Sequence, residues 1–182
     1  MGAAVTTTAF PPIRIETQRL VVAEFEAADA GNVAVVIAAG EWDALPPGAP
    51  RDAGAVWRWL RTDLGVFREA GQGVHLAIRQ RDSGTHVGAM SLFRLDRRQG
   101  TAEVGYGLRP AMRGRGYAVE ALSALTAWAL STGGLRRVDA VTAPENAASQ
   151  RVAERAGYLR VGVTRDPLTG REMLVYRRTR AD

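Results

Sequence analysis

Three β-rich segments joined by very short connections constrain the fold of this chain more than any other feature. They cover residues 73–80, 85–95 and 100–108, and the connecting sequences Arg-Asp-Ser-Gly and Asp-Arg-Arg-Gln are typical of turns. A four-residue connection cannot hold the long crossover that a parallel pair requires, so neighbouring strands must run antiparallel. The sequence therefore predicts a three-stranded antiparallel meander in the middle of the chain.

Helical and strand-like segments flank this meander on both sides. Apolar periodicity and glycine or proline breakers predict, before the meander, a strand over residues 19–25 and helices over 29–40 and 51–71, with a loop at 42–50. After the meander they predict a helix ending at Gly133–Gly134, a strand over 135–143, a helix over 145–157 and strands over 158–165 and 171–179.

This order of elements predicts one α/β domain with a mixed sheet. The chain has 182 residues, which is the usual size of a single domain, and it shows no internal repeat or linker. We expect residues 1–12 to be a flexible lead-in and residues 13–182 to form the domain.

Composition excludes several kinds of chemistry. The chain has no cysteine and only two histidines, so we expect neither a disulfide framework, nor a thiol nucleophile, nor a metal site. No segment approaches the roughly 18 apolar residues of a membrane span, and the first residues lack the pattern of a signal peptide. We therefore expect a cytoplasmic protein with no membrane partner. The net charge of +5 comes with arginine as the only basic residue, and it suits either nucleic acid or a polyanionic small molecule.

The segment Arg-Pro-Ala-Met-Arg-Gly-Arg-Gly-Tyr-Ala, residues 109–118, lies between a predicted strand and a predicted helix. Gly114 and Gly116 have no Cβ, so a ligand can approach their backbone N–H groups closely. N–H groups in the first turn of a helix have no intrahelical partner and lie at the positive end of the helix dipole. Arg113 and Arg115 add positive charge. The segment predicts a cradle for a pyrophosphate, although a solvated turn would use glycines in the same way.

Familiar nucleotide-binding motifs do not fit this loop. A P-loop needs a Gly-Lys-Ser/Thr ending, and a Rossmann fingerprint needs a third glycine where Val119 stands. Arg-Gly segments that bind nucleic acid are repeated and disordered, unlike this one. A phosphate cradle of another family is therefore favoured.

The loop resembles the acyl-CoA-binding motif of the GCN5-related N-acetyltransferases (GNAT), Arg/Gln-x-x-Gly-x-Gly/Ala, with Arg113, Gly116 and Ala118 at the matching positions. The likeness is to the RimJ/RimL branch, and it runs from about residue 15 to residue 176. It is carried by four segments in the same order, residues 16–22, 102–110, 114–122 and 144–158.

This resemblance implies a GNAT-type domain in which a mixed, mostly antiparallel sheet contains a splayed parallel strand pair and is flanked by helices. It implies acetyl-CoA as co-substrate and no metal. The pantetheine arm would bind between residues 102–108 and 136–141, and the pyrophosphate on the glycine loop. The cofactor positions it implies are Leu108, Arg109, Arg113, Gly114, Arg115, Gly116, Tyr117, Ala118 and Asn146. Arg155, near the end of the helix predicted over residues 145–157, is a further candidate to reach the CoA phosphates, and a solvated arginine is the alternative.

Two residues are candidates for the chemistry of acyl transfer. Glu103, on the strand that ends at Leu108, is the expected general base, although an ion-paired glutamate is the simpler alternative. Many relatives place a proton-donating tyrosine seven residues after the motif asparagine, but Ala153 stands there in this chain. The RimJ/RimL-like pattern offers Ser149 instead, three residues after Asn146 and on the same helix face. The alternatives are a plain N-cap for Asn146 and a packing role for Ser149.

The acceptor is expected to be a primary amine, either a protein N-terminus or a small molecule. Deprotonating an α-amine at pH 7 costs only about 1–1.4 kcal/mol, against about 4.6 kcal/mol for a lysine amine. Trp42, Phe93 and Glu172 lie in regions expected to bind the acceptor. The alternative is a catalytically silent module that binds CoA or nucleic acid, although nucleic acid is not the expected partner. A homodimer is left open.

Overall fold

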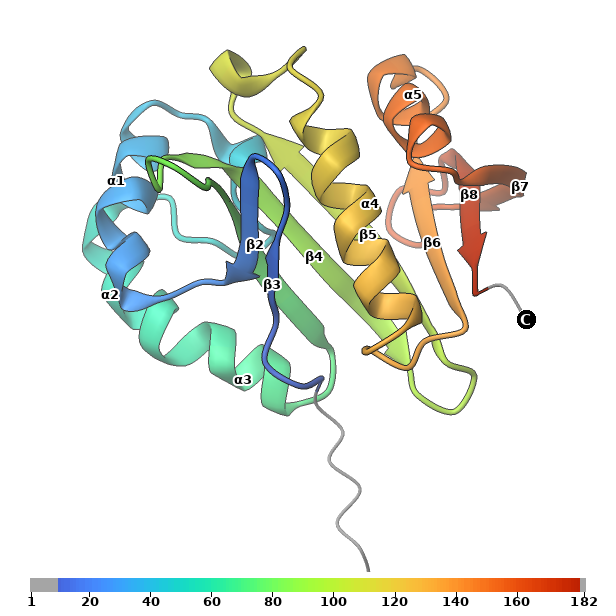
Figure 1. Ribbon diagram of the computed structural model, residues 1–182, viewed down its shortest axis with the longest axis horizontal. Coiled ribbons are helices and arrows are strands. Elements are labelled where there is room, and N and C mark those ends of the chain that lie inside the picture. Colours follow the sequence, from blue (N-terminus) through green and yellow to red (C-terminus); the bar gives the residue numbers. More distant parts are fainter. Residues whose placement is uncertain (1–9, 181–182) are drawn as a thin grey trace, which may run out of the picture.

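Eight strands form one mixed sheet in the order β1-β2-β3-β4-β5-β6-β8-β7, in a computed structural model that describes residues 10–180 (Figure 1). The strands are β1 Arg14–Glu16, β2 Leu20–Glu24, β3 Gly73–Gln80, β4 His86–Asp96, β5 Thr101–Leu108, β6 Arg137–Thr142, β7 Leu159–Arg165 and β8 Glu172–Thr179. The helices are α1 Ala30–Ala38, α2 Val56–Arg58, α3 Leu64–Glu69, α4 Tyr117–Leu130 and α5 Ala147–Arg155.

The predicted meander is confirmed, because β3, β4 and β5 pair antiparallel in sequence order. β5 and β6 form the parallel pair, and α4 provides the crossover that connects them. Their pairing ends at Val104 opposite Ala140, whereas β5 continues to Leu108. The two strands therefore separate beyond this point, and the splayed parallel pair is confirmed.

Helices cover both faces of the sheet. α4 and α5 lie side by side over the strands around β5 and β6 (Figure 1). Alternate strand residues show the division, because Leu76 and Ile78 join the core beneath α4 and α5, whereas Ala77 joins the core beneath α1 and α2. The two cores confirm the expected α/β architecture.

Three local features differ from the expectations. β1 was not expected, because its three residues are too few to show an alternating pattern. The second predicted helix contains a π-helical turn at Trp59–Asp63 between α2 and α3. Of the lead-in expected over residues 1–12, residues 1–9 lie outside the described residues, whereas Phe10 is buried and packs edge-on against Trp128. Among residues 10–180, no helix is long and apolar enough to span a membrane.

Candidate functional site

A pocket of about 600 Å³ opens where β5 and β6 separate. One wall is the end of β5, the second is the glycine loop with the first turn of α4, and the third is α5. Asp43 also contributes to the lining. The expected site residues that the structure brings together here are Leu108, Arg113, Gly114, Gly116, Tyr117, Ala118, Asn146, Ser149 and Arg155.

The glycine loop has the geometry of an anion cradle. Gly114 and Gly116 adopt φ angles of 75° and 81°, in the left-handed region that side chains disfavour, and Gly116 is the N-cap of α4. The backbone N–H groups of residues 114–119 have no hydrogen-bond partner in the described part of the chain. They therefore remain available to a ligand at the positive end of α4.

Side chains around the loop are held in different ways. Arg113 donates from Nε to the carbonyl of Leu108 at 3.1 Å. The buried Tyr117 accepts a hydrogen bond from Gln80 Nε2 at its hydroxyl, at 3.1 Å. Arg115 does not line the pocket, and its backbone carbonyl accepts a hydrogen bond from Arg19. The cradle is thus formed mainly by backbone, with the guanidinium of Arg113 beside it.

The edge of β5 beyond Val104 provides backbone groups to the pocket. Arg109 donates its N–H to Val87, so the alternation of an antiparallel pair directs the backbone of Tyr106 and Leu108 toward the gap between β5 and β6. Arg109 itself is occupied within the protein, because its carbonyl accepts from Met112 and its side chain forms an ion pair with Glu41 at 2.5 Å. An extended ligand can pair with this edge as an added strand would.

Ser149 lies in the pocket beside a residue that the sequence analysis missed. The hydroxyls of Ser149 and Tyr106 lie 3.0 Å apart, and the Tyr106 hydroxyl also donates to the Ser149 carbonyl at 3.1 Å. Burial raises the pKa of Tyr106, and the hydrogen bond to Ser149 offsets this only in part, so the phenol stays protonated. The sequence could have indicated Tyr106, because it lies two residues before Leu108 on β5 and side chains two residues apart on a strand lie on the same face.

The start of α5 explains how Ser149 is held. Asn146 is the N-cap of this helix, and its Oδ1 accepts a hydrogen bond from the Ser149 N–H at 3.0 Å. Ala153, which replaces the tyrosine of many relatives, is buried in the core. The hydroxyl of Ser149 is therefore the group that α5 presents to the pocket beside Tyr106.

Glu103 and Phe93 lie outside this pocket, opposite each other on neighbouring strands. Both carboxylate oxygens of Glu103 accept from Arg94 Nη1, at 2.8 and 3.0 Å. Arg94 has a φ of 48°, within an irregularity in the pairing of β4 with β5. Phe93 lies against Gly105, where an added Cβ would be 3.2 Å from its ring. The proposed base is thus ion-paired in this structure.

The other two expected acceptor residues lie on different elements. Trp42 is half-buried at the start of a 3₁₀ turn, and the guanidinium of Arg51 lies 5.4 Å from its ring centroid. The carbonyl of Asp43, in the same turn, packs so closely on Gly107 that no Cβ would fit there. Glu172 is exposed at the start of β8. Neither Trp42 nor Glu172 lines the pocket.

A sheet whose parallel pair opens beside a loop of unpaired backbone N–H groups has the geometry to hold an extended, phosphate-bearing ligand. Residues 19–159 match the family model described as an acetyltransferase (GNAT) domain, and the chain belongs to this family. In sequence, it is 29% identical over 106 residues to the uncharacterized N-acetyltransferase YoaA of Bacillus subtilis, covering 58% of this chain and 59% of that protein. The matched region spans less than two thirds of the curated relatives.

Two solved structures show the same fold. The ribosomal-protein-S5-alanine acetyltransferase from Vibrio fischeri superposes with a TM-score of 0.78 at 17% identity, covering 93% of this chain and 98% of that one. The microcin C7 self-immunity acetyltransferase MccE, in complex with acetyl-CoA and AMP, gives a TM-score of 0.75 at 17% identity, covering 90% and 93%. Among the residues the structure describes, no group of His, Asp and Glu side chains is arranged to hold a metal ion.

Proposed function

We propose that this protein is an N-acetyltransferase that transfers an acetyl group from acetyl-CoA to a primary amine. The observation that carries the proposal is the pocket itself, which joins the unpaired N–H groups of residues 114–119 to the hydroxyls of Ser149 and Tyr106 at the strand gap. The names of the relatives support the same activity.

The cofactor would occupy three parts of this pocket. Its pyrophosphate would accept hydrogen bonds from the cradle, with Arg113 and Arg155 supplying positive charge. Its pantetheine arm would pair with the exposed edge of β5 at Tyr106 and Leu108. Its thioester would then lie near Ser149. No step of the reaction requires a metal.

In the reaction, the amine nitrogen attacks the thioester carbon, the C–S bond breaks, the amine loses a proton and the thiolate gains one. Backbone N–H on the edge of β5 stabilises the oxyanion. Ser149 donates a hydrogen bond to the departing sulfur, and Tyr106 orients that hydroxyl once the phenol proton turns from the Ser149 carbonyl to the Ser149 hydroxyl. Glu103 is the proposed base, which requires that Arg94 release it, and water can replace it for an acceptor of low pKa.

We propose an α-amine, such as a protein N-terminus, as the preferred acceptor, ahead of a small-molecule amine. The reason is its low cost of deprotonation, because the only proposed base is ion-paired. Trp42 and Phe93 would contact the acceptor, and Glu172 would attract its positive charge. The solved structure of an S5-alanine acetyltransferase supports this preference by its name.

The test combines binding with an acceptor screen. Acetyl-CoA at 100 times its dissociation constant should stabilise the folded state by about 2.7 kcal/mol, seen as a rise in Tm. Release of free CoA thiol should then be followed with peptides that carry a free α-amine, and with matched peptides that are N-terminally blocked and contain lysine. Binding without turnover on any amine would indicate a silent CoA-binding module. A Tm that rises with RNA but not with acetyl-CoA would refute the proposal.

A further inference from the structure

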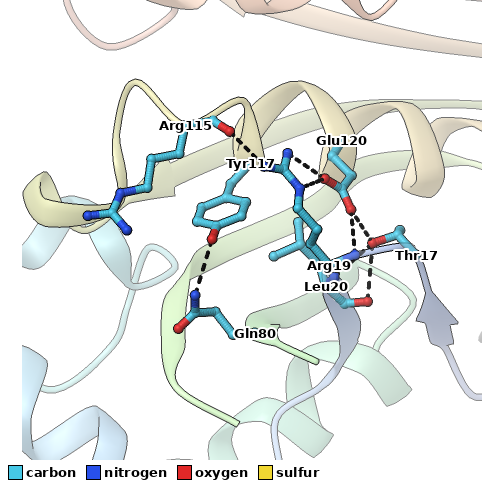
Figure 2. A network of polar contacts seen from close by, with 7 residues as sticks. All are labelled: Thr17, Arg19, Leu20, Gln80, Arg115, Tyr117 and Glu120. Atoms are coloured by element: carbon cyan, nitrogen blue, oxygen red, sulfur yellow. Dashed lines mark hydrogen bonds and ion pairs between the residues drawn. The ribbon is translucent and has the colours of Figure 1, made fainter. Parts of the chain in front are cut away.

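We propose that Arg19, which lies outside the pocket lining, is a positioning residue that sets the cradle for the pyrophosphate of CoA. The inference rests on the proposed cofactor. Arg19 precedes β2 and is about a hundred positions from the loop in sequence, yet Figure 2 shows its side chain between the loop and α4. No motif in the glycine segment accounts for this contact.

Arg19 joins the loop to the helix through its guanidinium group. Its Nη1 donates to the carbonyl of Arg115 at 3.0 Å, and its Nε donates to Glu120 Oε2 at 2.7 Å. Its guanidinium carbon also lies 4.7 Å from the centroid of the Tyr117 ring. Arg19 thus contacts both sides of Gly116, the residue at which the loop becomes helix.

The bond to the Arg115 carbonyl controls the direction of a cradle N–H. In a trans peptide the C=O and the following N–H point in opposite directions. Holding the carbonyl of Arg115 toward Arg19 therefore turns the N–H of Gly116 away from Arg19. Gly116 lines the pocket and its N–H has no partner in the described structure, so this N–H is directed to the ligand.

The ion pair with Arg19 also neutralises the negative charge of Glu120, which lies near the site proposed for the pyrophosphate. Glu120 lies in the first turn of α4, close to the position proposed for an anion. Burial raises the pKa of Glu120, but hydrogen bonds from Thr17 and Arg19 outweigh it and lower the pKa overall, so the carboxylate is ionised. Without Arg19, this negative charge would repel the pyrophosphate.

The contacts of Arg19 and Glu120 form one unit with the turn before β2. Glu120 Oε1 accepts from the Thr17 hydroxyl at 2.6 Å and from the Arg19 N–H at 3.0 Å (Figure 2). These bonds fix the turn that presents Arg19, so the guanidinium is preorganised before a ligand arrives. A preorganised donor costs less entropy on binding than a free side chain.

The test compares two acetyl donors that differ in the pyrophosphate. Arg19→Ala should weaken CoA binding, measured by calorimetry, by about 10- to 100-fold, the range for lost charge-assisted hydrogen bonds. The kcat/KM with acetyl-CoA should fall alike, whereas kcat/KM with S-acetyl-pantetheine, which has no pyrophosphate, should change less than about threefold. Arg19→Ala/Glu120→Gln should regain part of the loss, because the unpaired carboxylate is gone.

Arg68→Ala is the matched control. Arg68 also pairs with a glutamate, Glu24, and with a backbone carbonyl, that of Phe10, but it lies on α3 and outside the pocket. We expect its variant to bind CoA as the parent does. If Arg19→Ala does not fold, Arg19→Lys provides the test, because an ammonium can pair with Glu120 without also reaching the Arg115 carbonyl.

The outcomes separate this inference from the function on which it rests. Equal losses with both donors, or unchanged CoA affinity in the Arg19 variants, would overturn the positioning role while leaving the acetyltransferase proposal in place. An equal loss in Arg68→Ala would overturn it too, as general destabilisation. A parent protein that binds no CoA would instead refute the proposed function first.

Discussion

Ser149→Ala tests the proposed chemistry with little disturbance of the fold. The substitution removes one hydroxyl, while the Ser149 N–H keeps its bond to the side chain of Asn146. The hydroxyl of Tyr106 keeps an acceptor, since it also donates to the carbonyl of residue 149 at 3.1 Å. Alanine is a good helix residue, so α5 should be retained. A change in rate would therefore report on the hydroxyl.

The expected loss follows from what the hydroxyl does for the leaving group. A lost general acid lowers kcat by about 10²–10⁴, or about 2.7–5.5 kcal/mol of transition-state stabilisation. A thiol of pKa about 8.5 is already a fair leaving group near neutral pH, so we expect the low end of that range. Acetyl-CoA affinity should stay within about threefold, because the cradle N–H groups are untouched.

The assay is steady-state release of CoA thiol on an acceptor identified by the screen, with binding of acetyl-CoA measured separately. Tyr106→Phe is the companion variant, and it should lower kcat less, because Ser149 would keep its hydroxyl but lose its orientation. Full turnover by Ser149→Ala would refute the reasoning. Ser149 would then only pack, and the sulfur would take its proton from water or from the acceptor ammonium.

Two further predictions concern the cradle and the pH dependence of stability. Gly116→Val should abolish CoA binding. Gly134→Val, which changes a glycine of similar positive φ beyond the other end of α4, should lower the free energy of unfolding by a comparable amount, at least about 1–2 kcal/mol, and leave CoA binding intact. Calorimetry measures the binding and urea denaturation the stability, and CoA binding retained in Gly116→Val would place the cradle elsewhere. Burial lowers the pKa of His75 to about 4, so between pH 6.5 and 4 the unfolded state binds the extra proton and the free energy of unfolding falls as the pH falls. Urea denaturation at pH 7 and 5 should show a smaller fall in His75→Gln, and equal falls would contradict this assignment.

The features that the sequence predicted well depend on local information. The meander follows from short turns, and the cap of α5 follows from Asn146 at the start of a helical pattern. The glycine loop is of the same kind, because Gly114 and Gly116 lie close together in one segment between a predicted strand and a predicted helix. In each case the physical constraint acts within a few residues, so a single segment contains it.

The features that the sequence did not predict depend on contacts between distant segments. The Arg19–Glu120 pair joins residues 101 positions apart, and nothing in either segment specifies the other. An ion-paired Glu103 was one of the two readings of the sequence, but its partner was not predicted, because Arg94 lies within an irregularity of β4 and has a positive φ. The proximity of Tyr106 to Ser149 depends on where α5 lies over the strand gap. Tertiary packing decides these contacts.

The position of Glu103 imposes a geometric condition on the acceptor. Along β5, Ala102 and Val104 belong to the core beneath α4, so by alternation Glu103 lies on the opposite face, which Phe93 shares. Ser149 and the cradle lie on the α4 face.

An amine that Glu103 deprotonates must therefore meet the thioester through the gap between β5 and β6, beyond Val104. Gly105 lies at this point of β5, and it has no side chain to fill the space beside the ring of Phe93. Two residues farther along β5, the carbonyl of Asp43 packs on Gly107. Entry between two strands suits an amine at the end of an extended chain, and this adds a second reason to propose a peptide N-terminus ahead of a bulky amine.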